Sequence, residues 1–210
     1  TVNTSGKMLR IKLSYLLLCC LLVSNQLLQA QRVLHVDVLV VGGGASGITA
    51  GIQAARLNVK TLVVEETTWL GGMLSAAGVS ATDGNHLLPS GLWGEFRERI
   101  YAHYGGPSKV ATGWVSNTHF EPHVANQIWK EMASAEKSLQ IIHQYQFRSA
   151  IVQKGSHISG ARFINLQNES QLVVYAKQVI DATELGDVMA SAGVPFDVGM
   201  EASATTGENV

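Results

Sequence analysis

The stretch Asp37-Val-Leu-Val-Val-Gly-Gly-Gly-Ala-Ser-Gly-Ile-Thr-Ala-Gly51 decides the fold of this chain. It opens with residues 38–41, an uncharged aliphatic run that is typical of a buried parallel strand. A Gly-x-Gly-x-x-Gly turn follows directly, and an Ala-rich apolar stretch with helical spacing comes after the turn. A strand, a glycine turn and a helix in this order predict a site for a dinucleotide.

Each glycine of the first glycine loop (residues 42–47) has its own physical reason. Gly42 allows a tight strand-to-helix corner, Gly44 lets a pyrophosphate approach the bare backbone, and Gly47 lets the helix lie close to the strand. The helix expected to begin near Ala45 directs free N–H groups and the positive end of its dipole at the phosphates. Ser46 is expected to help cap this helix, because no nucleophile-elbow pattern surrounds it. Gly43, between the first two glycines, belongs to the same predicted site.

An acidic residue ends the next predicted strand, Thr61–Glu65. The interval from Gly42 to Glu65 fits the roughly 20-residue spacing to a ribose-binding carboxylate. We expect Glu65 to accept hydrogen bonds from both hydroxyls of an adenosine ribose, and its charge disfavours the 2′-phosphate of NADP. Glu66 is the second candidate, expected just beyond the strand end. The alternative is a glycine-rich loop that binds no ligand.

The second glycine loop, Gly71-Gly72-Met73, follows soon after this acid. A glycine pair at this place can bring backbone N–H groups against the pyrophosphate from the side opposite the first loop. The alternative is an ordinary loop that happens to contain two glycines. Its position after a dinucleotide turn and a ribose acid favours the binding role.

The rest of the chain predicts alternating helices and strands. We expect helices at 92–104, ended by Gly105, and at 123–137, opened by Pro122, with a loop at 110–119 between them. A strand at 139–145 precedes an antiparallel meander with strands at 151–153, 158–164 and 171–175. A separate buried strand then ends in Asp181-Ala182-Thr183, and a helix starts within 185–192. The expected fold class is α/β: a Rossmann-like dinucleotide-binding domain with a parallel sheet, helices and an antiparallel β-meander.

Composition excludes several other functions. The chain has 210 residues, of which 46% are hydrophobic and 15% charged, so we expect one globular domain with a substantial core. A net charge of −1 argues against nucleic acid as a partner. His119 and His123 have the spacing of paired metal ligands on a helix, but Pro122 places the helix start between them, and no metal site is predicted.

Residues 1–30 are expected to be a signal peptide, with Met8 as the start. Arg10 and Lys12 precede an apolar run at 13–23, and the segment ends in Ala30. This layout predicts export to the periplasm or the extracellular space, with residues 31–210 as the binding domain and no membrane span after cleavage. The alternative is a membrane anchor formed by an uncleaved segment. Both cysteines of the chain, residues 19 and 20, lie inside the apolar run, so the mature chain has no thiol pair.

The order of these motifs resembles a known family. The first glycine loop, Glu65, the second glycine loop, the meander and the segment Val179-Ile-Asp-Ala-Thr-Glu-Leu-Gly-Asp187 resemble the N-terminal part of FAD-dependent oxidoreductases with the two-dinucleotide-binding-domain, glutathione-reductase-like fold. Within them the chain is similar to the bacterial branch whose second loop reads Gly-Gly-Met. The resemblance runs from about residue 36 to residue 210. It departs at Glu184, where glycine is usual.

The resemblance implies one FAD bound in an extended form. Its pyrophosphate would contact the first glycine loop, its ribose Glu65, and the second loop would lie between the pyrophosphate and the isoalloxazine. The backbone near Phe147 and Arg148 would meet the adenine. The Asp181-Ala182-Thr183 strand resembles the Ala-Thr-Gly strand of the family. The implied cofactor-binding set is Gly42, Gly43, Gly44, Ala45, Ser46, Gly47, Glu65, Glu66, Gly71, Gly72, Met73, Asp181, Ala182 and Thr183.

The implied function is hydride transfer from a small-molecule substrate to flavin, with reoxidation by an electron acceptor; neither partner is identified by the sequence. The missing cysteine pair excludes flavin disulfide reductase chemistry. No catalytic residue is assigned; His86 is the best candidate base, against a plain surface histidine. Family members continue beyond this point, so we expect an incomplete domain and a fragment. The alternatives are an NAD-binding dehydrogenase domain and a secreted, non-catalytic remnant of a flavoprotein.

Overall fold

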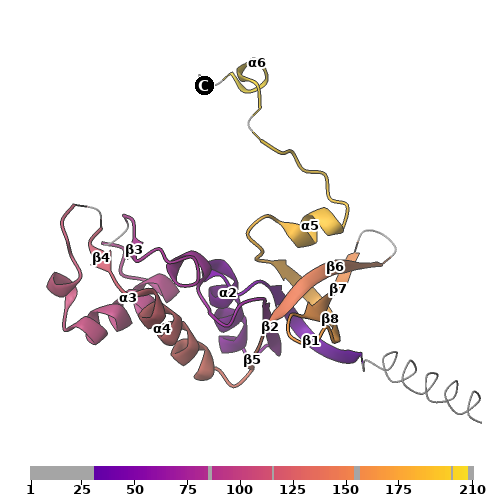
Figure 1. Cartoon of the computed structure of the whole chain (residues 1–210), viewed down its shortest axis with the longest axis horizontal. Helices are drawn as coiled ribbons and strands as arrows, with labels where there is room; N and C mark the ends of the chain where they lie inside the picture. Colours follow the sequence, from indigo (N-terminus) through magenta and orange to yellow (C-terminus); the bar gives the residue numbers. More distant parts are fainter. Residues whose placement is uncertain (1–30, 85–86, 115, 154–156, 200, 208–210) are drawn as a thin grey trace, which may run out of the picture.

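The computed structural model describes residues 31–207 except 85–86, 115, 154–156 and 200. The predicted signal peptide and His86 lie outside the described residues. The described part is an α/β domain built around a six-stranded sheet with the strand order β5-β2-β1-β8-β7-β6 (Figure 1). The expected fold class is therefore confirmed.

The sheet has a parallel half and an antiparallel half. The strands β5 (Leu139–His143), β2 (Thr61–Glu65), β1 (Arg32–Val41) and β8 (Gln171–Asp181) run parallel to one another. The antiparallel meander continues from β8 through β7 (His157–Asn165) to β6 (Tyr145–Gln153). All five residues of β2 are buried, as expected for an inner parallel strand.

The last strand of the meander and the strand that ends in Asp181 are one strand, and the prediction of two separate strands is wrong. β8 pairs with β7 through residues 171–175 and with β1 along almost its whole length, up to Asp181 opposite Val41. Lys177 and Gln178 are exposed in the middle of β8, and these polar residues suggested a break. The continuous strand ties the meander rigidly to the parallel sheet.

α2 (Ala45–Arg56) packs on β1, β2 and β5, α4 (Pro122–Ser134) packs against α2, and α3 (Gly91–Tyr104) packs against α4 (Figure 1). Their apolar faces form one buried cluster that includes Ile48, Phe96, Ile100, Ala125, Trp129 and Met132. Gly105 ends α3 in the left-handed conformation, and Pro122 opens α4, as predicted. The end of α4 is three residues earlier than predicted, because the chain turns toward β5 after Ser134.

The meander packs on the opposite face. Alternate residues of β1 and β2 face the meander: Leu39, Val41, Leu62 and Val64. They form a second buried cluster with Phe163 and Leu172 of the meander and with Val188 of α5 (Asp187–Ser191). The two inner strands are thus covered on both sides, which explains their uncharged runs at 38–41 and 61–64. α5 has only five residues and begins two residues later than expected.

Short elements complete the chain. Residues 118–119 were expected in a loop but form β4 (Thr118–His119), which pairs antiparallel with β3 (Ala81–Thr82) through two residue pairs. Two 3₁₀ turns, η1 (Gly72–Leu74) and η2 (Pro107–Lys109), and the four-residue α6 (Ser203–Thr206) are the other elements of the described residues. The segment after α5 runs away from the sheet (Figure 1). No helix in the described part of the chain combines the length and apolarity that crossing a membrane requires.

Candidate functional site

A cleft of about 900 Å³ opens at the carboxyl ends of β1, β2 and β8. Open α/β sheets bind ligands at this edge, and the volume is near the top of the roughly 300–1,000 Å³ typical of cofactor sites. The lining of this main cleft comes from both glycine loops, the end of β2, the start of β6 and the turn between β8 and α5; it includes Gly42, Gly44, Glu65, Glu66, Gly72, Met73, Phe147, Arg148, Ala182, Thr183 and Glu184.

The first glycine loop is packed too tightly for any side chain at two positions. Gly42 has φ +97°, and a Cβ on it would lie 2.4 Å from the carbonyl oxygen of Ala182. A Cβ on Gly47 would lie 2.0 Å from the carbonyl oxygen of Gly42. These contacts confirm the tight corner at Gly42 and the close approach of the helix at Gly47. Whether the loop contacts a cofactor stays a prediction.

α2 begins at Ala45, as predicted, with Gly44 as its N-cap residue. The prediction that Ser46 caps the helix is wrong. No side chain caps α2, and Ser46 lies exposed inside its first turn, where its carbonyl accepts a hydrogen bond from Thr49 Oγ1 at 2.9 Å. Gly44, the N-cap residue, lines the main cleft, so the N-terminus of α2 lies at the cleft without a capping side chain, an arrangement that favours an anion.

The second glycine loop lies directly against the first. The amide of Gly71 donates a hydrogen bond of 2.9 Å to the carbonyl of Gly43, and Gly71 forms a parallel bridge with Gly44. A Cβ on Gly72 would lie 3.0 Å from Cα of Gly44. Met73 is 57% exposed and lines the cleft. The two loops that were predicted to approach one pyrophosphate from opposite sides are thus brought together.

Glu65 has a structural role that the sequence did not reveal. Its side chain is buried at the end of β2, where Oε2 accepts a 2.6 Å hydrogen bond from the amide of Gly43 and Oε1 a 2.8 Å hydrogen bond from the amide of Thr67. The carboxylate thereby braces the first glycine loop while it lines the cleft. Glu66 lies just beyond the strand, as predicted, and also lines the cleft.

The turn after β8 is held by its own side chains. Asp181 Oδ1 accepts hydrogen bonds from the amide and the hydroxyl of Thr183, and Oδ2 accepts one of 2.9 Å from the amide of Met189. The hydroxyl oxygen of Thr183 accepts a 2.7 Å hydrogen bond from the amide of Asp187. Ala182 donates its amide to the carbonyl of Val41 at 2.9 Å. This network places Ala182, Thr183 and Glu184 against the first glycine loop.

The start of β6 forms another edge of the cleft. Phe147 and Arg148, which the resemblance places near an adenine, line the cleft together with Tyr145 and Gln146. His119 and His123 lie elsewhere, in β4 and in the first turn of α4, and neither lines the cleft. Within the described ranges, no group of three or more His, Cys, Asp or Glu side chains is arranged to hold a metal.

Comparison with known proteins agrees with this geometry. The family model described as "FAD dependent oxidoreductase" matches residues 37–210. Digeranylgeranylglycerophospholipid reductase of Sulfolobus acidocaldarius is 27% identical over 71% of this chain and 34% of its own length. Thiamine thiazole synthase of Methanococcus aeolicus is 32% identical over 71% of this chain and 55% of its own length.

A solved structure shares the fold. The crystal structure of THI4 from Thermovibrio ammonificans superposes with a TM-score of 0.53 at 16% identity and covers 86% of this chain and 68% of its own. The aligned part of this chain spans only 34% to 55% of the two curated relatives. The family match extends from the strand before the first glycine loop to the last residue, and on that ground the chain belongs to the FAD-dependent oxidoreductase family.

Proposed function

We propose that this chain binds one FAD in an extended form along the main cleft, as the N-terminal part of a flavin-dependent oxidoreductase. The observation that carries the proposal is the meeting of the two glycine loops at the uncapped N-terminus of α2. We assign the protein to the glutathione-reductase-like branch whose second loop reads Gly-Gly-Met.

The residues present fit this cofactor. Among the described residues, a Cβ on Gly44 would approach one exposed side chain, Glu184 Oε1 at 3.2 Å, so no backbone blocks a ligand on that side. Gly71 and Gly72, with φ of +105° and +50°, hold a conformation that L side chains rarely adopt. Unoccupied helix N–H groups and the dipole of α2 attract a pyrophosphate without any basic side chain.

Each edge of the cleft would take one part of the cofactor. Backbone amides of residues 44–46 would donate to the pyrophosphate, and Glu65, which has further lone pairs, would accept from the adenosine ribose. Phe147 and Arg148 would lie beside the adenine. Gly72 and Met73 would lie toward the isoalloxazine, where Met73 would shield the ring from water.

A flavin bound in the cleft supplies two-electron chemistry, in which a small-molecule substrate gives up a hydride and a separate electron acceptor later takes the electrons. The contribution of the described residues is to bind and orient the cofactor and to exclude water from its edge. None of them is assigned as a catalytic acid or base.

The test is to purify the protein and identify what it retains. We expect a yellow protein with flavin absorbance that releases FAD on denaturation, in a ratio of one per chain. A colourless protein that takes up NAD but no FAD would overturn the proposal in favour of an NAD-binding dehydrogenase domain. Failure to bind either dinucleotide would indicate a non-catalytic remnant.

A further inference from the structure

The carboxylate of Glu184 occupies the point where the two glycine loops meet. A Cβ on Gly44 would lie 3.2 Å from Glu184 Oε1, and a Cβ on Gly72 would lie 3.2 Å from the same oxygen. Gly72 itself lies against Cα of Gly44 and near the amide nitrogen of Ala45. One acidic oxygen therefore lies beside both loops, at the N-terminal end of α2.

The backbone of Glu184 cannot easily move away. Asp181 and Thr183 fix the turn on its N-terminal side, and the hydrogen bond from the amide of Asp187 to Thr183 closes the turn on the other side. A Cβ on Gly42 would lie 2.4 Å from the carbonyl oxygen of Ala182, so the turn is packed against the first loop. The side chain of Glu184 is exposed, and rotation of that side chain is the free movement that remains.

Charge makes this position costly for an anion. Four acidic residues line the main cleft, Glu65, Glu66, Glu184 and Asp187, against one basic residue, Arg148. Glu65 is turned toward two backbone amides, which offset its charge. Glu184 instead adds a negative charge where the dipole of α2 attracts one. Two anions at this place repel each other, and the repulsion is screened by salt.

We propose that Glu184 acts as a built-in competitor for the pyrophosphate site: its carboxylate takes the anion position between the glycine loops in the ligand-free protein and must rotate out when the cofactor binds. The inference rests on the proposed function, because it concerns FAD in the same cleft. The side chain of Glu184 therefore lowers the affinity of the protein for FAD. Because salt screens the repulsion, the affinity of the wild type should approach that of a variant without the charge as the ionic strength rises.

The test is a titration of ligand-free full chain with FAD, followed by flavin fluorescence, at low and at high salt. Glu184→Gln removes the charge and keeps the size, and Glu184→Ala removes both. Glu98→Gln is the matched control, because it makes the same exchange at an exposed residue of α3 that does not line the cleft. We expect both Glu184 variants to bind FAD about fivefold more tightly at low salt, with the difference shrinking at high salt, and Glu98→Gln to change the affinity by less than about twofold.

The alternative role is that of a ligand. If Glu184 accepts a hydrogen bond from the cofactor, both variants will bind FAD more weakly, and the inference is wrong. Unchanged affinity in both variants also overturns it while leaving FAD binding intact. Absence of FAD binding by the wild-type protein and all variants overturns the proposed function, and the inference with it. Melting curves of the ligand-free proteins check that each variant is folded.

Discussion

Gly47 shows how a single missing side chain builds the site. A Cβ at this position would lie 2.0 Å from a backbone oxygen and 3.0 Å from Cβ of Ala182, so two parts of the chain would have to separate. The helix would then move off the strand, and the amides at its N-terminus would leave the cleft.

Replacing Gly47 by alanine is therefore expected to destabilise the protein by about 1–3 kcal/mol, which lowers Tm by roughly 2–10 °C. FAD binding should be lost as well. Ser46→Ala is the matched control, because Ser46 is exposed and caps nothing, and its effect on stability should stay within about 0.5 kcal/mol. Calorimetry measures both variants. If Gly47→Ala were as stable as the wild type, the close packing of α2 against the first glycine loop and Ala182 would be contradicted.

Glu65 links the strand end to the first glycine loop through two backbone amides. A glutamine at this position keeps the shape but presents an NH₂ group to one of the two N–H donors. We expect Glu65→Gln to lower the free energy of unfolding by about 1–3 kcal/mol without any ligand, because one buried donor is left unpaired.

Urea unfolding of the ligand-free protein measures this effect. The control Glu66→Gln should change the free energy of unfolding by no more than about 0.5 kcal/mol. Equal stabilities of the two variants would exclude the bracing role of Glu65. A separate FAD titration of Glu65→Gln reports on the proposed ribose contact.

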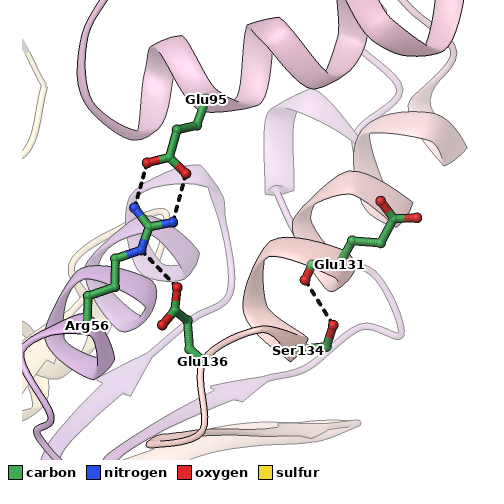
Figure 2. Close-up of polar contacts among 5 residues, drawn as sticks. All are labelled: Arg56, Glu95, Glu131, Ser134 and Glu136. Carbon is green, nitrogen blue, oxygen red and sulfur yellow. Dashed lines mark hydrogen bonds and ion pairs between the residues drawn. The ribbon is translucent and has the colours of Figure 1, made fainter.

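Among the secondary-structure elements, Arg56 links the end of α2 to α3 and to the segment after α4. It ends α2, and its guanidinium donates to both carboxylate oxygens of Glu95 in α3, at 2.6 and 2.7 Å, and to Glu136 after α4, at 2.8 Å (Figure 2). Near these contacts, in the last turn of α4, Ser134 Oγ donates a hydrogen bond to the carbonyl oxygen of Glu131. The hydrogen bonds and charge of Arg56 lower the pKa of Glu95.

Arg56→Met should lower the free energy of unfolding by about 1 kcal/mol at neutral pH. This value allows for solvent screening of the partly exposed ion pair between Arg56 and Glu95. Because the pKa of Glu95 is lowered in the folded state, its contribution is present above the ordinary pKa of a glutamate and is lost as the pH falls through the lowered value. The stability difference between wild type and variant should therefore shrink below about pH 4.

Urea unfolding at several pH values checks this prediction. Lys177→Met, which removes the more exposed ion pair between Lys177 and Asp37, is the control and should have a smaller effect. A difference that stays constant down to pH 2 would mean that Arg56 acts through packing of its methylene groups and not through Glu95.

Over the whole molecule, the parts that could be predicted are those whose sequence pattern is local. Residues 38–41 and 61–64 are uncharged runs, Gly105 and Pro122 mark helix ends, and the first glycine loop has its Gly-x-Gly-x-x-Gly spacing. The continuity of β8 was missed because exposed Lys177 and Gln178 interrupt its apolar pattern, while pairing with β1 carries the strand through them.

The site shows the same division. The loop residues were found by motif, but the hydrogen bond between Gly71 and Gly43, the bracing by Glu65 and the position of Glu184 all join residues far apart in the sequence. Such contacts depend on how the turns pack at the sheet edge. No local pattern contains them, and a glutamate where glycine is usual gave no hint of the side chain's direction.

Titration of the ligand-free chain with FAD measures whether the main cleft is a flavin site. We expect saturation at one FAD per chain for the wild type and no saturable binding for Gly47→Ala. Tight binding of FAD by Gly47→Ala, or failure of the folded wild type to bind FAD at all, would contradict the assignment of the main cleft as the flavin site.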